Sequence, residues 1–330
     1  MTEVRLSVVL PVFNGARYLT AALASIHHQT FRDFEVVLVD DGSTDETPQI
    51  ISDWVRRDSR FRVIRHRTNL NCANARNTGL ENARNPLVLQ ADADDINEPE
   101  RFAIQAETAR GHPEMGIIGT NLTHNDNSTW RCPATSDGIR AQLLWGPPFG
   151  HPSVLLNQKV LGDFRYDPDY EYCEDLDLWL RFVYRVPTMN IQRKLVWYRH
   201  PAGSLSRTLS ARRLEIERIL MRRRSHLLNT NLDADAGLAC LLGNRAIAIG
   251  STRISTHIVH MARTAINMGV ASPEAILRTV RQQSFLLWRN YGLSHLATDL
   301  PQLVRNTLKL FYEVKRHQTG GHVQLVSGSY

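Results

Sequence analysis

The stretch EVVLVDDGSTDET, from Glu35 to Thr47, decides the fold. Residues 36–39 within it are all apolar, without the alternation of a half-buried strand. Such a run is typical of a strand buried on both faces of a parallel sheet. Asp40 and Asp41 therefore come at the carboxyl end of that strand. Because ligands bind at the carboxyl ends of strands in open α/β sheets, these two carboxylates are candidate binding residues.

The residues after this strand predict the start of a helix. Gly42 permits a tight turn, and the spacing of Ser43 and Glu46 fits a capping box, in which the two side chains satisfy free backbone N–H groups. Pro48 then falls in the first turn, where a missing N–H costs little.

The first hundred residues alternate strand-like and helix-like segments, which predicts a parallel sheet covered by helices. The expected strands are Leu6–Val12, Val36–Val39, Phe61–His66 and Pro86–Gln90. From residue 114 to 206 the pattern is mixed, with strands expected at 115–122, 151–156 and 189–200 and a helix at 174–186. Beyond residue 206 the sequence is helical in pattern. We therefore expect a catalytic domain over residues 1–206 and an appended helical region over residues 207–330.

Charge is distributed unevenly along the 330 residues. Residues 1–200 hold 22 Lys and Arg against 26 Asp and Glu, a net charge of −4, whereas residues 201–330 hold 17 against 7, a net charge of +10. A basic region can contact an anionic lipid surface, nucleic acid or a phosphorylated substrate. The basic segment Arg212–Arg224 and the amphipathic segment Leu303–Val314 are the candidates for a membrane surface.

The four cysteines show no C-x-x-C pair, so neither a zinc site nor a disulfide framework is predicted. Charged residues interrupt the N-terminus early, and no window of about 18 apolar residues occurs. These features predict a cytoplasmic protein, with peripheral attachment to the inner face of the cell membrane as an extension of that expectation.

A second strand also ends in carboxylates, in the sequence ADADD of residues 91–95. Strands that end at one edge of a parallel sheet would bring this cluster beside Asp40 and Asp41. Concentrated negative charge repels itself unless a cation is present, and ligands that are all oxygen suit Mg²⁺ or Mn²⁺. A calcium loop is excluded because Ile96 and Asn97 stand where it needs an oxygen ligand and a glycine.

Two other nucleotide-binding classes lack their motifs. Dinucleotide binding needs a G-x-G-x-x-G turn after the first strand, where this chain has LPVFNGARYL with one glycine. No Walker P-loop occurs either.

The blocks SVVLPVFNGARYL, DFEVVLVDDGSTDET, NCANARNTGLENA and QADADD together resemble the family 2 glycosyltransferases of GT-A fold. HPSVLL, EYCEDLDLWLRF and WYRHPAGSLS follow in the order of that family's later blocks. The resemblance covers residues 4–206. It implies a Rossmann-like, mostly parallel sheet flanked by helices, and an inverting transfer of sugar from a nucleotide donor, with a UDP-sugar expected.

The resemblance also implies roles for individual residues. The nucleotide would contact Pro11, Phe13, Asp40, Asp41 and Arg76, with Phe13 stacked on the base. Asp92, Ala93 and Asp94 form a D-x-D motif, whose two carboxylates would engage the ribose and the metal; which of Asp92, Asp94 and Asp95 is the main ligand stays open.

In the same way, Asp175 of the Glu174–Asp175 pair would be the general base, and His200, Ser204 and Ser206 would lie in a loop near the diphosphate. One departure is Asn71, which stands where the family commonly has glycine.

The expected partners are a nucleotide-sugar donor and a glycan or lipid-linked glycan acceptor. One alternative is a nucleotidyltransferase, which would release pyrophosphate, but the glycine- and Lys/Arg-rich triphosphate loop of such an enzyme is missing after the first strand. The other is a nucleic-acid or anionic-surface binder that uses the basic region; no aromatic or zinc pattern favours nucleic acid.

Overall fold

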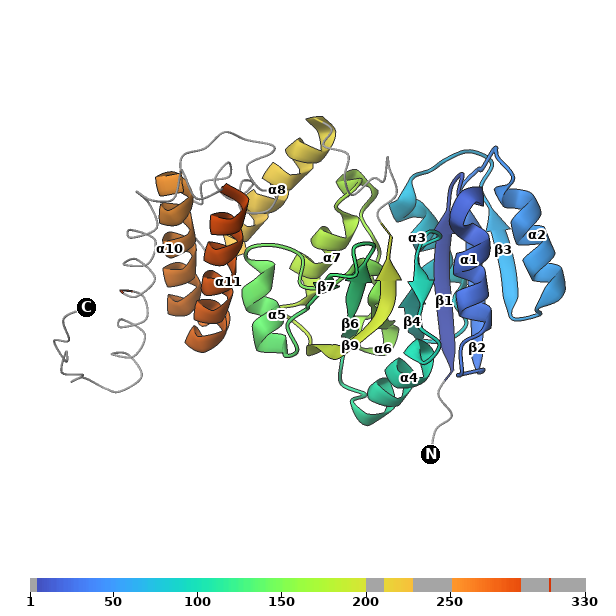
Figure 1. The fold of residues 1–330 in the computed structure, drawn as a ribbon, viewed down its shortest axis with the longest axis horizontal. Helices are drawn as coiled ribbons and strands as arrows, with labels where there is room; N and C mark the ends of the chain where they lie inside the picture. The colour runs from blue at the N-terminus through green and yellow to red at the C-terminus, as the bar shows by residue number, and fades with distance from the viewer. Residues whose placement is uncertain (1–4, 200–210, 228–250, 292–308, 310–330) are drawn as a thin grey trace. The chain divides into compact units, whose positions relative to one another are not determined.

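The structure is a computed structural model, which describes residues 5–199, 211–227, 251–291 and 309 (Figure 1). The chain divides into two compact units, one of residues 1–139 and 147–216 and one of residues 140–146 and 217–330. The domain boundary predicted after residue 206 lies outside the described residues. The assignment of residues 140–146 to the second unit is a feature that the sequence pattern did not indicate.

The first unit contains a mixed sheet and its covering helices. Its strands are β1 (Leu6–Val12), β2 (Phe34–Asp40), β3 (Phe61–Arg65), β4 (Leu87–Gln90), β5 (Ile96–Asn97), β6 (Ile117–His124), β7 (Thr129–Trp130), β8 (Leu155–Asn157) and β9 (Thr188–Tyr198). Its main helices are α1 (Ala16–His27), α2 (Thr47–Arg57), α3 (Cys72–Asn82), α4 (Arg101–Gly111), α6 (Gln158–Leu161) and α7 (Glu174–Phe182), and short 3₁₀ turns cover His151–Ser153 and Pro168–Tyr170.

The sheet has the strand order β3-β2-β1-β4-β8-β6-β9-β5, with β7 paired to β6. Strand β1 pairs in the parallel sense with β2 and β4, and β2 with β3, as expected from the continuous apolar runs of β1 and β2. Strand β8 pairs in the antiparallel sense with both β4 and β6, and β6 is parallel to β9. As a result, β1, β2, β3, β4, β6 and β9 all end at one edge of the sheet.

Helices cover both faces of the parallel half (Figure 1). On one face, β1 and β2 contribute Val8, Leu10, Val36 and Leu38 to a core with α1, α2 and α4. On the other face, Val37 and Val39 pack against Ala75 of α3. This two-sided burial explains why the strand sequences do not alternate.

Helix α3 lies unusually close to the sheet because of one glycine. A Cβ atom on Gly79 would come within 2.3 Å of the Cγ1 atom of Val9 in β1. Only a residue without a side chain allows this approach, which brings the start of α3 to the edge where the parallel strands end.

The strand expected at 151–156 forms only in part. His151–Ser153 is a 3₁₀ turn, and the strand β8 begins at Leu155. The long strand expected at 189–200 is confirmed over the described residues as β9. Its last part pairs with β5, which directly follows the acidic segment 91–95.

The described part of the second unit consists of helices joined by short turns. Helices α10 (Ser251–Asn267) and α11 (Pro273–Tyr291) pack on Ala141, Leu144 and Trp145 to form a separate apolar core. The basic segment 212–224 lies within α8 (Ala211–Leu227), whereas residues 303–314 are outside the described part apart from Lys309. Among the described helices, none combines the length and the apolar character needed to cross a membrane.

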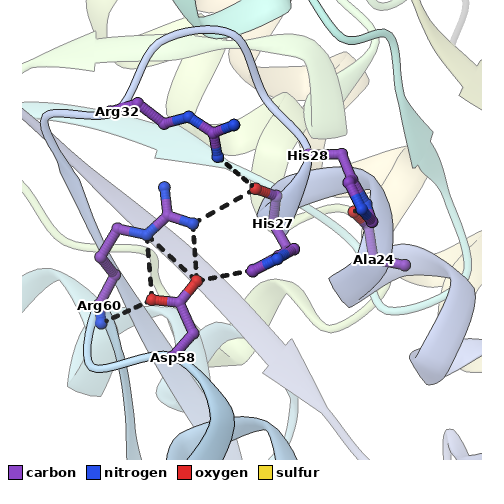
Figure 2. A network of polar contacts seen from close by, with 6 residues as sticks. All are labelled: Ala24, His27, His28, Arg32, Asp58 and Arg60. Carbon is purple, nitrogen blue, oxygen red and sulfur yellow. Dashed lines mark hydrogen bonds and ion pairs between the residues drawn. The ribbon is translucent and has the colours of Figure 1, made fainter.

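A polar network ties the ends of α1 and α2 to the start of β3 (Figure 2). Because β1, β2 and β3 are parallel, the edge where β3 starts is opposite the edge where the acidic clusters lie. Asp58 accepts hydrogen bonds from the backbone N–H of Arg60 at 3.0 Å and from its guanidinium Nη2 at 2.6 Å. His27 Nδ1 lies 2.8 Å from the second carboxylate oxygen of Asp58, whose side chain is 9% exposed. This network accounts for His27, at the end of α1, as a structural residue.

We expect Asp58→Asn to lower the free energy of unfolding by about 2 kcal/mol at pH 7, because it leaves buried donors without their charged acceptor. Burial alone would raise the pKa of Asp58, but hydrogen bonds from Arg60 and His27 outweigh it and hold that pKa far below its usual value. The carboxylate therefore stabilises the fold fully above about pH 4, and this contribution is lost as the pH falls further.

Urea unfolding of wild type and variant between pH 2 and 7 measures this difference. The matched control is Asp53→Asn, which removes a carboxylate that is 57% exposed and paired with Arg56 on the surface of α2. Equal loss of stability in the two variants would contradict the assigned role of Asp58.

Candidate functional site

The acidic clusters predicted to share an edge do so. In the parallel register, Val12 of β1 lies beside Asp40 of β2, and Val9 of β1 lies beside Gln90 of β4. The residues that follow these strand ends therefore gather at one edge. They are Phe13 and Asn14, Asp41, and Asp92 to Asp95.

The loops after β1 and β2 are tied together by hydrogen bonds. The backbone N–H of Asn14 donates to Ser43 Oγ at 2.9 Å, and Asn14 Oδ1 accepts from the N–H of Thr44 at 2.8 Å. The capping box predicted for Ser43 and Glu46 is therefore wrong. The Ser43 hydroxyl accepts from the loop after β1, and α2 begins only at Thr47, without a side-chain cap.

This arrangement holds the first loop in a fixed position. Phe13 follows β1 and is 49% exposed, as a ring available for stacking should be. Pro11 lies inside β1, buried and paired with Val39, so its contribution is to the strand that supports Phe13.

Asp40 and Asp41 have different surroundings. Asp40 is fully buried, accepts from the N–H of Ser43 at 2.9 Å and pairs with Arg65 Nε at 3.0 Å. It therefore shapes the turn after β2. Asp41, which is 3% exposed, receives both the backbone N–H of Leu70 and the imidazole of His66 on its Oδ1 atom.

Three carboxylates form a cluster in the loop after β4. Asp92, Asp94 and Asp95 each present an oxygen, and these atoms lie within 4.8 Å of one another. Burial and the neighbouring charge of Asp92 raise the pKa of Asp94 to about 6 and raise that of Asp95 well above its usual value. Asp95 Oδ2 is buried and has no hydrogen-bond partner in the described part of the chain.

This donor set fits a divalent cation. The oxygens are hard ligands, they are crowded enough to repel one another, and one buried oxygen lacks a partner. Asp92, Asp94 and Asp95 are therefore the residues that would hold Mg²⁺ or Mn²⁺. Asp95 is also fixed by the backbone N–H of Arg199, which donates to its Oδ1 at 2.8 Å.

Two buried arginines lie behind the acidic cluster. Arg76 of α3 is 4% exposed and donates to Asp92 Oδ1 at 2.7 Å and to Gln90 Oε1 at 3.1 Å. Arg101 of α4 is fully buried and donates to the backbone carbonyl of Gln90 at 2.9 Å. Arg76, predicted to face the nucleotide, thus has its guanidinium on the D-x-D motif.

The start of α3 is set by Asn71, whose φ of 79° lies in the left-handed region. With a ψ of 164°, this is a conformation that glycine adopts readily and other residues adopt only at a cost, and the Asn71 side chain accepts from the N–H of Asn74 as a helix cap. The glycine that the family commonly has at this position could not form this side-chain cap.

Glu174 and Asp175 begin α7, as predicted, and both are partly exposed. The N–H of Leu176 donates to Asp175 Oδ1 at 2.7 Å. Burial raises the pKa of Glu174, although the nearby charge of Arg76 and a hydrogen bond with Cys72 partly offset it. Arg76, which donates to Asp92, also interacts electrostatically with Glu174 at the start of this helix.

Tyr166 and His151 support this side of the site. His151 Nε2 lies 2.8 Å from the Tyr166 hydroxyl, and both residues are buried. Burial and the charge of Arg76 hold the pKa of His151 well below its usual value, so the imidazole is neutral. Tyr166 is in turn fixed to α3 by reciprocal backbone hydrogen bonds with the amide of Asn77.

Sequence reasoning missed several of these residues. Arg199 directly precedes His200 in the block WYRHPAGSLS and could have been included with it. His66, Arg101 and Tyr166 carry no local signal, because each is defined by a partner far away in the chain. His200, Ser204 and Ser206 lie outside the described residues.

Comparison with known proteins shows the family to which this chain belongs. The profile of glycosyl transferase family 2 matches residues 7–161. An uncharacterized glycosyltransferase of Haemophilus influenzae is 37% identical over 204 residues, which are 61% of this chain and 78% of that protein. The chain therefore belongs to glycosyl transferase family 2.

Other relatives are similar over shorter shares of their length. A second uncharacterized glycosyltransferase of Haemophilus influenzae is 28% identical over 58% of this chain, and the match spans 64% of that protein, slightly less than two thirds. The amylovoran biosynthesis glycosyltransferase AmsE of Erwinia amylovora is 30% identical over 54% of this chain and 69% of that protein.

Solved structures share the GT-A fold. Residues 1–349 of Staphylococcus aureus TarS, in complex with UDP-GlcNAc, match with a TM-score of 0.58 at 18% identity, covering 98% of this chain and 95% of that one. The mannosyltransferase PcManGT of Pyrobaculum calidifontis, in complex with GDP-Man and Mn²⁺, matches with a TM-score of 0.54 at 18% identity, covering 95% and 88%.

Proposed function

We propose that this protein is a metal-dependent, inverting glycosyltransferase that moves a sugar from a nucleoside-diphosphate sugar, a UDP-sugar, to a hydroxyl group of a glycan or lipid-linked glycan. The observation that carries the proposal is the cluster of Asp92, Asp94 and Asp95 at the edge where the parallel strands end. The base-binding candidates Phe13 and Asp41 follow neighbouring strands. Arg76, which donates to Asp92, also interacts electrostatically with Glu174, the neighbour of Asp175 in the sequence.

The acidic cluster would hold the metal ion. When bound, this ion would neutralise the negative charge that develops on the departing diphosphate. Arg76 fixes Asp92 from behind, and Arg199 fixes Asp95 through its backbone N–H. These contacts hold the carboxylates in place before substrate binds, so little rearrangement is needed at the moment of reaction.

Asp175 would accept the proton of the acceptor hydroxyl as that oxygen attacks the anomeric carbon. A single in-line attack of this kind inverts the configuration of that carbon. Asp175 lies in the first turn of α7, and the positive end of the helix dipole there favours a negatively charged carboxylate. The N–H of Leu176 keeps one carboxylate oxygen oriented.

The donor and acceptor classes are supported by what similar proteins bind or make. TarS and PcManGT were crystallised with UDP-GlcNAc and GDP-Man, and the second of these with Mn²⁺. AmsE is named for the biosynthesis of a polysaccharide. The basic helix α8 would suit attachment to an anionic membrane surface from the cytoplasmic side.

The test is a panel of sugar nucleotides incubated with the protein and Mn²⁺, with and without EDTA. We expect one donor to release a nucleoside diphosphate and EDTA to stop the release. Release of pyrophosphate would indicate a nucleotidyltransferase instead. If no donor were turned over with Mn²⁺, the proposal would be contradicted.

A further inference from the structure

His66 lies at the end of β3 and occupies one oxygen of Asp41. Its Nδ1 atom is 2.6 Å from Asp41 Oδ1, and its Nε2 atom is 3.0 Å from the hydroxyl of Thr78 in α3. The imidazole is 10% exposed and the Asp41 side chain 4%. Because the carboxylate can only accept, Nδ1 carries a proton and donates it to Asp41 Oδ1.

A second donor fills the same oxygen. The backbone N–H of Leu70 reaches Asp41 Oδ1 at 3.0 Å. A carboxylate oxygen has two lone-pair positions, and His66 and Leu70 therefore use both of those on Oδ1. The other oxygen, Oδ2, accepts no hydrogen bond from any described residue.

Two exposed apolar residues are connected to Asp41 by backbone hydrogen bonds, one directly and one through its neighbour in the chain. Leu70, whose N–H binds Asp41, has a side chain that is 47% exposed, and Phe13 is 49% exposed. Phe13 follows Val12, whose carbonyl accepts from the N–H of Asp41 at 2.8 Å. Exposed apolar groups beside a single available carboxylate oxygen suit the faces and the edge of a nucleobase.

The number of free acceptors distinguishes the bases. Uracil presents one N–H on its pairing edge, between two carbonyls, and one acceptor satisfies it. Guanine presents two adjacent N–H groups and needs two acceptors side by side. Cytosine and adenine place a ring nitrogen lone pair where the carboxylate would repel it. A site that leaves a buried donor without an acceptor rejects that ligand strongly.

We infer that His66 is a specificity-determining residue, which selects uracil over guanine by filling the Asp41 oxygen that guanine's second N–H would need. The inference rests on the proposed use of a nucleoside-diphosphate donor and names its base. His66 acts through Asp41 and is a positioning residue.

Calorimetric titration of UDP, GDP and CDP into the full chain with Mn²⁺ tests this assignment. We expect wild type to bind UDP at least about ten-fold more tightly than GDP or CDP. His66→Leu frees a lone pair on Oδ1, so the ratio of UDP to GDP affinity should fall by about ten-fold. In His66→Asn, the amide nitrogen replaces Nδ1 as the donor, so the ratio should stay close to that of wild type.

Thr78→Val keeps the imidazole but removes the hydroxyl that orients it. This change should also lower the ratio of UDP to GDP affinity, by a smaller factor than His66→Leu does. This variant decides the matter if His66→Leu does not fold. A ratio that is the same in wild type, His66→Leu and Thr78→Val overturns the role of His66 and leaves the proposed function standing. A wild type that prefers GDP overturns the role of His66 and the choice of a UDP-sugar, but leaves transfer from a nucleoside-diphosphate sugar standing. A wild type that binds none of the three diphosphates overturns both proposals.

Discussion

Asp175→Asn should lower the rate of sugar transfer by about 10²- to 10⁴-fold while nucleotide binding stays within a few-fold of wild type. The amide has the same shape as the carboxylate but cannot take a proton from the acceptor hydroxyl. Asp175 belongs to the start of α7, whereas the base-binding candidates Phe13 and Asp41 belong to the loops after β1 and β2. Loss of the base should therefore affect kcat and leave the dissociation constant of the nucleotide almost unchanged.

The measurement is kcat for transfer together with the affinity for the nucleoside diphosphate, in the same preparation. A matched control is Asp163→Asn, which removes a carboxylate that is 86% exposed and paired with Arg165 on the surface. This control should behave as wild type, since a surface ion pair contributes little. If Asp175→Asn retained most of its activity, the general base would have to be another group, with Glu174 as the next residue to test.

The sequence predicted the parallel half of the sheet because physical constraints there are local. Residues 36–39 are apolar on both faces, and the structure buries them between α3 on one side and α1, α2 and α4 on the other. The acidic residues that end β2 and precede β5 follow from the same pattern. Their meeting at one edge needed only the rule that parallel strands end together.

Predictions failed where a tertiary contact competed with a local one. Ser43 has the spacing of a helix cap, yet its hydroxyl accepts from Asn14, 29 residues away. His151 belongs to a run with the apolar pattern of a strand, but its ring is used by Tyr166 and it lies in a 3₁₀ turn. A single sequence contains no information on which of these partners will be near.

The supporting residues of the site were missed for the same reason. Arg101 is a charged residue in a helix and reads as exposed, but the structure buries it completely under the acidic loop. His66 has no pattern of its own, and its importance comes from Asp41, 25 residues earlier. Residues 140–146 were likewise read as part of the first unit, although their apolar side chains complete the core of the second.

Asp94→Asn should abolish tight Mn²⁺ binding and lower donor hydrolysis by at least about 100-fold, because it removes one of three clustered oxygen ligands. The same change should stabilise the metal-free fold by about 1 kcal/mol. Burial and the charge of Asp92 raise the pKa of Asp94 to about 6, so at pH 7 the folded state holds this carboxylate charged at a cost that the unfolded chain does not have. The neutral amide removes that cost.

A loss of Mn²⁺ affinity together with a gain in the stability of the metal-free protein would show that Asp94 binds the metal and is not needed for the fold. Electron paramagnetic resonance gives the free Mn²⁺ in a titration, and urea unfolding in EDTA gives the stability of the metal-free protein. The control Asp126→Asn alters a carboxylate in the exposed turn between β6 and β7, where it accepts from the N–H of Ser128, and should leave Mn²⁺ binding unchanged. If Asp94→Asn instead lost stability and kept its Mn²⁺ affinity, Asp94 would be a structural residue of the loop and the metal site would have to lie elsewhere.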